Sequence, residues 1–153
     1  MRAFVAATLV ALAFTSIEAG AVDRAAEDEA RASIELMQAR AQIAARDYAA
    51  AELHLAAARA RVPGDPDVHS LLGFCTRKLG RFDDSYAHYQ RALRIDPQHL
   101  GAREYLGELY LQRGELEQAR AQLAELERLC PAGCEERSEL ANAILAHGTV
   151  SAP

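Results

Sequence analysis

Two cysteines near the end of the chain have the residue types and spacing for redox chemistry or a covalent cross-link. Cys130 and Cys134 enclose Pro131, Ala132 and Gly133. The proline and glycine favour a turn that would bring the two sulfurs together. Because paired cysteines form disulfides in an oxidising compartment, we expect a structural staple. Its short loop stabilises by less than the roughly 3 kcal/mol of a 15-residue loop.

Three other interpretations of this pair stay open. Dithiol exchange sites usually have two residues between the cysteines, whereas three lie here. A metal site needs further ligands, and His147 is the only nearby candidate. Two unpaired thiols are the third. Cys75 is expected to be a small buried hydrophobic side chain within a helix, with an intermolecular disulfide as the alternative.

The histidines form no catalytic pattern. His54 and His88 lie 34 residues apart, which places them at equivalent positions of successive helices, and we expect partly exposed residues there. His69, His99 and His147 have no apparent partners. The sequence contains no nucleophile elbow, phosphate loop or zinc-protease motif. We therefore expect no enzymatic activity, no cofactor and no metal site.

The composition predicts helices. The chain has 153 residues, a net charge of -5 and 50% hydrophobic residues, with no tryptophan. Ala, Leu, Glu, Arg and Gln dominate, and these are strong helix formers. The part after residue 22 has no run of β-branched and aromatic residues typical of a strand. The mild acidity and the lack of clustered Lys and Arg argue against a nucleic-acid surface.

Residues 1–21 have the features of a secretory signal peptide. Arg2 is followed by an apolar stretch over residues 3–14, and small residues occupy positions 19–21. The stretch is shorter than the roughly 20 residues that span a bilayer. We expect cleavage after Ala21, a periplasmic or secreted protein, and no stable membrane insertion afterwards. An uncleaved N-terminal anchor is the alternative.

A period of 34 residues runs through the rest of the chain. Pro63, Pro97 and Pro131 are spaced by this number. A fixed period in this range is typical of stacked supersecondary units. The same spacing relates the sets Tyr48, Phe82, Leu116; Ala51, Ser85, Ala119; Leu55, Tyr89, Leu123; and Ala58, Ala92, Leu126.

Glycines indicate where each unit turns and packs. Gly80 and Gly114 are expected to end the first helix of their units in a left-handed conformation, and Arg46 stands at the equivalent position before them. Gly73 and Gly107 are expected to let two helices approach closely. The pattern of a small residue, a helix-ending glycine, an apolar second helix and a closing proline therefore predicts helix–turn–helix pairs.

This pattern resembles the tetratricopeptide repeat family, most clearly in Leu72-Gly73 and Leu106-Gly107-x-x-Tyr110. The resemblance covers residues 32–133 and implies an all-α solenoid of three helix pairs. The first pair is degenerate, as terminal repeats often are. The expected divisions are a signal peptide 1–21, a helical extension 22–31, repeats 32–65, 66–99 and 100–133, a capping helix 134–147 and a flexible tail 148–153.

The capping helix is expected to cover the last repeat with an apolar face. Leu140, Ala141, Ile144 and Leu145 fall on one side of this helix. The opposite, polar side is made mostly by Glu135, Glu136, Arg137 and Glu139.

The resemblance also implies a concave groove that binds an extended peptide or a helix of another protein. The family's groove positions place apolar, basic and acidic residues along it. In this sequence they are Ser33, Leu36, Arg40, Ile43, Ala44, Asp67, Ser70, Phe74, Arg77, Lys78, Gly101, Glu104, Glu108, Leu111 and Gln112.

These residues do not match the Lys and Asn with which some family members grip a C-terminal carboxylate. A partner segment of mixed charge with an apolar anchor fits better. We expect Phe74, Arg40 and Arg77 to contribute most to binding, since interface anchors favour aromatics and arginine. Alternatively, Phe74 packs in the seam between repeats and the charged residues form an ordinary solvated surface.

The sequence thus predicts a non-enzymatic protein-interaction module, a scaffold, adaptor or assembly factor, with no nucleic-acid or small-molecule substrate. A second hypothesis is a thiol-redox or chaperone accessory protein that uses Cys130 and Cys134. A third is self-association through the ends of the stack.

Overall fold

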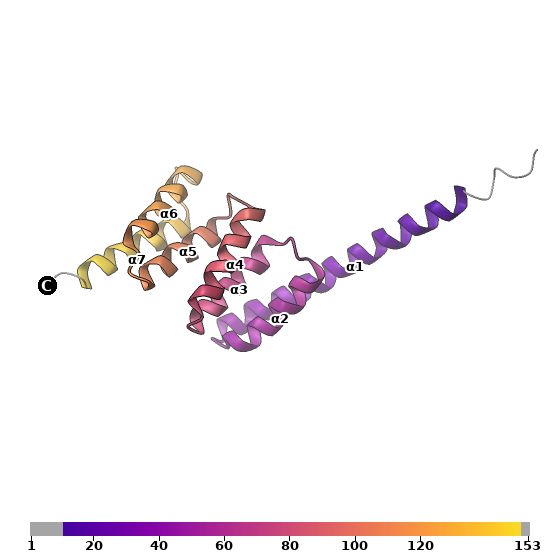
Figure 1. Cartoon of the computed structure of the whole chain (residues 1–153), viewed down its shortest axis with the longest axis horizontal. Coiled ribbons are helices and arrows are strands. Elements are labelled where there is room, and N and C mark those ends of the chain that lie inside the picture. The colour runs from indigo at the N-terminus through magenta and orange to yellow at the C-terminus, as the bar shows by residue number, and fades with distance from the viewer. Residues whose placement is uncertain (1–10, 151–153) are drawn as a thin grey trace, which may run out of the picture.

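A computed structural model describes residues 11–150, with side chains over residues 22–148. This part of the chain contains helices and no strand, which confirms the predicted all-α solenoid (Figure 1). None of its helices is both long and apolar enough to cross a bilayer. The helices are α1 (Ala11–Ala44), α2 (Tyr48–Arg61), α3 (Pro66–Lys78), α4 (Phe82–Ile95), α5 (Leu100–Gln112), α6 (Leu116–Leu129) and α7 (Glu135–Val150).

The helices pack as successive pairs. α1 packs on α2, α3 on α4 and α5 on α6, while α7 packs on both α5 and α6. The turns between these pairs lie at the predicted repeat boundaries. Figure 1 shows the N-terminal part of α1 projecting away from the body formed by the other helices.

The ends of the chain differ in detail from the expected divisions. α1 is continuous from Ala11, so the expected extension at 22–31 and the first helix of the first repeat are a single helix. Residues 11–21 of the expected signal peptide belong to this helix, and residues 1–10 lie outside the described residues. α7 continues to Val150, which makes the first three residues of the expected tail helical.

Helix starts follow from capping side chains. The Asp65 carboxylate accepts hydrogen bonds from the backbone N–H of Asp67 at 2.8 Å and of Val68 at 3.3 Å, and Pro66 opens α3. Asp47 caps α2 through the N–H of Ala50 at 3.0 Å. Each contact satisfies a donor that the first helical turn leaves free.

Three equivalent turns are left-handed. Gly80 and Gly114 have φ angles of 79° and 76°, as expected for residues that end a helix without a Cβ penalty. Arg46, at the same position of the first pair, has a φ of 62° despite its side chain. The degenerate first repeat therefore keeps the backbone of the other two without their glycine.

Two glycines permit close helix packing, as predicted. A Cβ on Gly73 would lie 2.5 Å from the Tyr89 ring of α4. A Cβ on Gly107 would lie 2.5 Å from the end of the Leu140 side chain of α7. The first glycine thus seats an aromatic ring within a repeat, whereas the second seats the capping helix on the last repeat.

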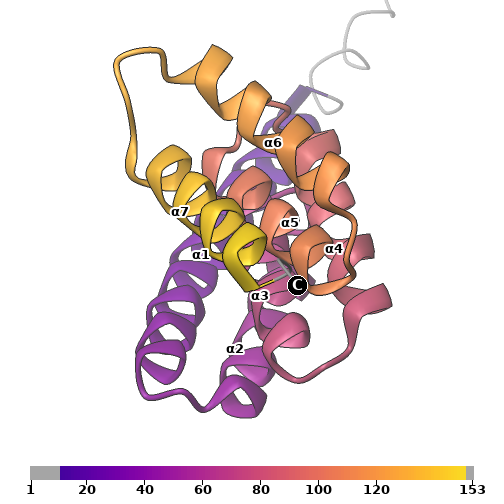
Figure 2. The ribbon, with the colours of Figure 1, turned by 90° about the vertical axis from the view of Figure 1, so that its left-hand side faces the viewer.

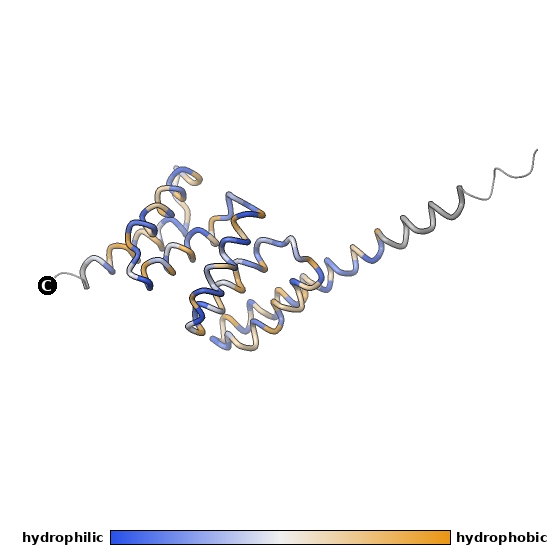
Figure 3. The backbone as a smooth tube through the Cα atoms, in the orientation of Figure 1, coloured by the Kyte–Doolittle hydropathy of each residue, from blue (hydrophilic) through white to orange (hydrophobic). Residues whose placement is uncertain are grey.

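The core consists of three clusters of buried apolar residues that follow one another along the stack. Figure 3 shows apolar residues alternating with hydrophilic ones along the helices of the body. Tyr89, Leu55, Leu106 and Leu126 are among the largest fully buried side chains of the core. On α7 the predicted inner residue Leu140 is fully buried. The prediction that Leu145 shares this apolar face is wrong as regards burial, because its side chain is 69% exposed. Near its end α7 therefore covers less of the repeat than its sequence suggested.

Candidate functional site

The first helices of the pairs and the capping helix contain the residues that the sequence singled out. We call the surface formed by α1, α3, α5 and α7 the first-helix face. Figure 2 shows α1 and α7 on one side of the body and α4 and α6 on the other. α3 packs on α5, and α5 on α7, so the residues of these three helices lie near one another.

Phe74 lies at the centre of this face and is half-buried. Its ring centroid lies 5.0 Å from that of Tyr105 on α5 and 6.0 Å from that of Tyr48 on α2. The Lys78 ammonium lies 5.1 Å from the ring centroid, within the range of a cation–π interaction. Phe74 therefore joins neighbouring repeats and still presents part of its ring, under an exposed cation.

Arg77 is placed differently from the expectation of a solvent-facing groove residue. Its side chain is only 2% exposed and forms an ion pair with Glu108. Its Nε donates to the Tyr89 hydroxyl at 3.4 Å. Burial is possible here because α4 and α5 supply both partners, which offset the cost of desolvating the guanidinium. Leu111 is also buried.

The N-terminal part of the face presents paired charges. Arg40 of α1 donates to the Asp67 carboxylate of α3 at 2.9 Å, with both side chains about half exposed. His99 Nε2 lies 3.0 Å from Asp67 while its Nδ1 accepts from the N–H of Ala102 and caps α5. Hydrogen bonding to His99 and the nearby Arg40 charge lower the pKa of Asp67. This role of His99 was not predicted, because histidine is an uncommon residue at the start of a helix.

Leu36 and Ile43 complete the apolar residues expected on α1. Both are partly buried and pack against the N-terminal core cluster. Both side chains therefore contribute mainly to the packing between α1, α2 and α3, and less to the floor of an open groove. Lys78 and Arg40 are the exposed cations among the fifteen predicted groove residues.

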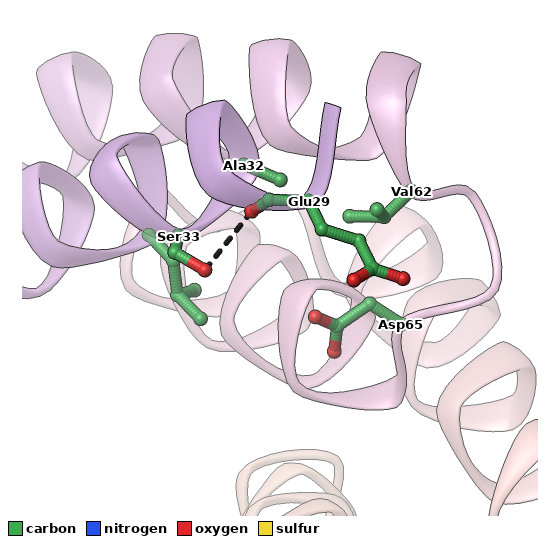
Figure 4. A pocket seen from close by; sticks show the side chains of 6 residues that line it. Glu29, Ala32, Ser33, Val62 and Asp65 are labelled. Atoms are coloured by element: carbon green, nitrogen blue, oxygen red, sulfur yellow. Dashed lines mark hydrogen bonds between the residues drawn. The ribbon is translucent and has the colours of Figure 1, made fainter. Parts of the chain in front are cut away.

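A pocket of about 430 Å³ lies at the N-terminal edge, between α1 and the turn before α3 (Figure 4). The carboxylates of Glu29 and Asp65 point toward one another in this view. Ser33 donates its hydroxyl hydrogen to the backbone carbonyl of Glu29 at 3.0 Å. Asp65 caps α3, so its carboxylate is already bonded within the chain.

A smaller pocket of about 250 Å³ lies between α5 and α7. Glu104, only 3% exposed, lines it. Burial, and then the carboxylates of Glu108 and Glu139, raise the pKa of Glu104 to about 8. We call this pocket the acidic pocket; it is lined by Gly101, Glu104, Tyr105, Glu135, Glu136 and Glu139.

The sequence reasoning expected Glu104 on the face but missed this pocket. It assigned Glu135, Glu136 and Glu139 to the outer, polar side of the capping helix. In the structure the N-terminal turns of α7 bring these carboxylates to the first turn of α5. The signal in the sequence was the acidic start of α7, which we interpreted only as the polar side of the capping helix.

The cysteine pair forms a disulfide between Cys130 and Cys134. Cys130 ends α6, and Arg137 of α7 donates to the carbonyls of Cys130 and Pro131 at 3.5 Å and 3.4 Å. The link therefore holds the turn between α6 and α7. Cys75 is free and buried, as expected, and burial raises the pKa of its thiol to about 12.

His54 and His88 are partly exposed, as expected, and do not form a site together. His54 lies 2.7 Å from Glu35 of α1, and the ring of His88 packs 5.9 Å from that of His69. Within the described residues no group of three or more His, Cys, Asp or Glu has a geometry suited to a metal ion.

Comparison with known families gives two overlapping matches. Models described as tetratricopeptide repeat match residues 36–99 and residues 77–129. Together they span the part of the chain in which the 34-residue period appears. No curated protein sequence is significantly similar to this chain.

Solved structures share the fold at low sequence identity. The TPR2B domain of yeast Sti1, in a complex with pHsp70, is 16% identical with a TM-score of 0.71, over 78% of this chain and 98% of that one. The Arabidopsis OM64 TPR domain is 12% identical with a TM-score of 0.70, covering 78% and 98%. The Yersinia enterocolitica type III secretion chaperone SycD, with a peptide of the translocator YopD, is 22% identical with a TM-score of 0.65, covering 77% and 89%.

Proposed function

The chain belongs to the tetratricopeptide repeat family, and we propose that it is a non-enzymatic module that holds a segment of a partner protein on its first-helix face. The observation that carries this proposal is the half-buried Phe74 ring with the exposed Lys78 cation above it. Two proteins with a similar fold are each seen with another protein or peptide: the TPR2B domain of Sti1 in a complex with pHsp70, and SycD with a peptide of the translocator YopD. Aromatic side chains next to cations are favoured anchors of such interfaces.

The arrangement of charges favours a partner segment of mixed sign. Arg40 and Lys78 are exposed and would attract carboxylates of the segment. An apolar side chain of the segment would pack on Phe74 between them. Arg77 is left out of this contact because it is buried and already paired with Glu108. Its part in the proposal is to hold Glu108 and Tyr89 in place.

We also propose that the module acts after export, as a periplasmic or secreted scaffold, adaptor or assembly factor. The apolar stretch at 3–14 and the small residues at 19–21 support export. A cut after Ala21 would remove the first residues of α1 and leave Val22, which is 68% exposed and holds no core contact to lose. Mass spectrometry of the mature protein tests the cut: a chain that still begins before Val22 contradicts it.

For the disulfide we propose a structural staple in preference to a redox centre. The bond joins the end of α6 to the start of α7 and would keep the capping helix on the last repeat. Thiol titration of natively purified protein, with and without mild reductant, separates the two roles. A pair that stays oxidised until denaturation supports the staple, and a pair that cycles readily under native conditions supports redox exchange.

The test of the interaction surface is crosslinking capture of partners from the protein's own cell envelope. We would compare the parent with R40Q/K78Q, which removes the two exposed cations of the face. R91Q/R94Q is the matched control, since Arg91 and Arg94 are exposed on α4, away from this face. We expect a partner that the control retains and R40Q/K78Q loses. Equal retention by both variants would contradict the proposed surface.

A further inference from the structure

The acidic pocket contains a buried carboxyl group that no part of the described chain satisfies. Glu104 is 3% exposed and lines the pocket, and its carboxyl group forms no hydrogen bond or ion pair with a described residue. A buried polar group without a partner is costly and unusual in a folded protein. Such a group, facing a cavity, is typical of a site that a ligand completes.

Among the described residues, no Lys or Arg lines this pocket. Arg77, whose positive charge acts on Glu104, is already paired with Glu108 and bonded to the Tyr89 hydroxyl. Arg103 of α5 donates to the carbonyl of Pro97 at 2.6 Å, on the far side of the helix start. Arg137 of α7 bonds to the turn that contains the disulfide. The carboxylates of the pocket can therefore attract a cation from another molecule.

The size and walls of the pocket restrict that group. Its volume of about 250 Å³ lies below the roughly 300–1,000 Å³ typical of sites for drug-sized molecules. It suits a single long side chain. Tyr105 lines one wall, so a planar cation entering beside it would gain an aromatic contact as well as carboxylate partners. Arginine combines a planar, weakly hydrated cation with five donors, whereas lysine offers a compact, strongly hydrated one.

We propose that the acidic pocket receives an arginine side chain of the partner segment, with Glu104 as the inner ligand and Glu135, Glu136 and Glu139 around the entrance. This rests on the proposed function, because the arginine belongs to the segment held on the first-helix face. The segment would then place its carboxylates toward Arg40 and Lys78 and its arginine toward α7. The pocket would thus fix the direction in which the segment lies.

Binding of a guanidinium would also change the protonation of Glu104. In the free protein its pKa of about 8 keeps it mostly neutral at pH 7. The groups facing it are Glu108 on its own helix, Glu136 and Glu139 on α7, and Arg77 on α3. The positive charge of an arginine would offset the effect of the three neighbouring carboxylates and favour the ionised form of Glu104. The proton of Glu104 therefore passes to solvent as the arginine enters.

The experiment uses the purified protein and two synthetic peptides, acetyl-Ala-Ala-Arg-Ala-Ala-amide and its citrulline counterpart. Citrulline keeps the shape of arginine and removes its charge. NMR would follow the Tyr105 ring and the carboxyl carbon of Glu104 during each titration. We expect the arginine peptide to bind and to lower the pKa of Glu104 from about 8 toward its ordinary value, and the citrulline peptide to do neither.

Two variants separate a built site from general attraction between opposite charges. E104Q keeps the shape of the neutral side chain and removes almost no charge at pH 7, so it should fold like the parent. E127Q removes an exposed carboxylate of α6. We expect E104Q to weaken the arginine peptide about tenfold and E127Q to leave it nearly unchanged.

Equal responses to the two peptides, or an equal affinity in E104Q and the parent, would overturn the pocket assignment. Neither result affects the capture experiment with R40Q/K78Q, which tests the first-helix face on its own. Conversely, a face that captures no partner leaves the peptide titration to report on the pocket alone. The two proposals can therefore fail separately.

Discussion

The middle of the first-helix face and its C-terminal end differ in whether their buried charged side chains have partners. In the middle, the buried Arg77 is paired with Glu108 and bonded to Tyr89. At the end, the carboxyl group of Glu104 faces a pocket of further carboxylates and forms no hydrogen bond or ion pair with a described residue. The paired charges hold helices in register, whereas the unpaired one is kept neutral by burial.

This difference distinguishes charged residues that stabilise the fold from those that a ligand can bind. The sequence alone does not separate the two kinds, because both occupy the predicted groove positions. A paired, buried ion has already found its partner, and a new ligand would have to break that contact. An unpaired carboxyl in a pocket gains its first partner when a ligand arrives. The four predictions below test the contrast by the stability of the folded chain.

The largest effect is expected from Arg77→Ala. It leaves Glu108 without its cation and removes the donor to the Tyr89 hydroxyl. Breaking one side of a buried pair costs about 3 kcal/mol of the free energy of unfolding. Urea unfolding of the variant measures this loss. The double variant R77M/E108L should recover most of it, and a single variant as stable as the parent would show that the pair is not structural.

Gly73→Ala should be the next most disruptive change. The new Cβ would meet the Tyr89 ring, which is fully buried and bonded to Arg77, so we expect a loss of about 2 kcal/mol. Gly107→Ala meets only the flexible end of Leu140 on α7 and should cost less. Thermal unfolding of the two variants gives the order. The reverse order would mean that the capping helix, not the middle of the stack, is the more rigidly packed region.

Glu104→Gln should change the pH dependence of stability. The pKa of Glu104 is raised by folding to about 8, so between its ordinary value and pH 8 the folded state binds the proton more tightly than the unfolded state. The free energy of unfolding of the parent therefore falls as pH rises from 5 to 8.

Because glutamine does not titrate, E104Q should be close to the parent at pH 5 and more stable than the parent by at least about 1 kcal/mol at pH 8.5. Urea unfolding at the two pH values measures the difference, and E127Q serves as a control on α6. A constant difference between E104Q and the parent across this range would show that Glu104 is not held neutral by its surroundings.

The smallest effect is expected from Arg40→Ala. Its ion pair with Asp67 is about half exposed, and such pairs contribute less than about 1 kcal/mol. Chemical unfolding should give a stability within about 0.5 kcal/mol of the parent. A large loss would place Arg40 with the structural charges and would make it unsuitable as a probe of binding.

Most of the fold could be predicted from the sequence because it depends on local signals. The glycines at 80 and 114 each act within one turn of the chain, and the 34-residue period repeats the same signals from one unit to the next. Arg46 kept the left-handed turn without a glycine, and only its position in the period revealed this. The repeat pattern therefore carried information that the residue type did not.

The candidate site was less predictable because it depends on contacts between helices. Nothing in the type of Arg77 shows that Tyr89 and Glu108 surround it, and the same residue at the same helical position could have been exposed. The acidic pocket needs the start of α7 to meet the start of α5. That meeting is set by Gly107 and Leu140, whose packing the sequence suggested without showing which carboxylates it would gather.

The central claim is that a partner protein lies on the first-helix face. Its most direct test is a photo-reactive p-benzoylphenylalanine in place of Lys78, beside the same replacement of Arg91 on α4, each irradiated in the cell envelope. Both side chains are exposed, so both probes are available for crosslinking. The account predicts a crosslinked partner from position 78 and none from position 91. The same partner from position 91 alone would contradict it and move the interaction to the opposite side of the stack.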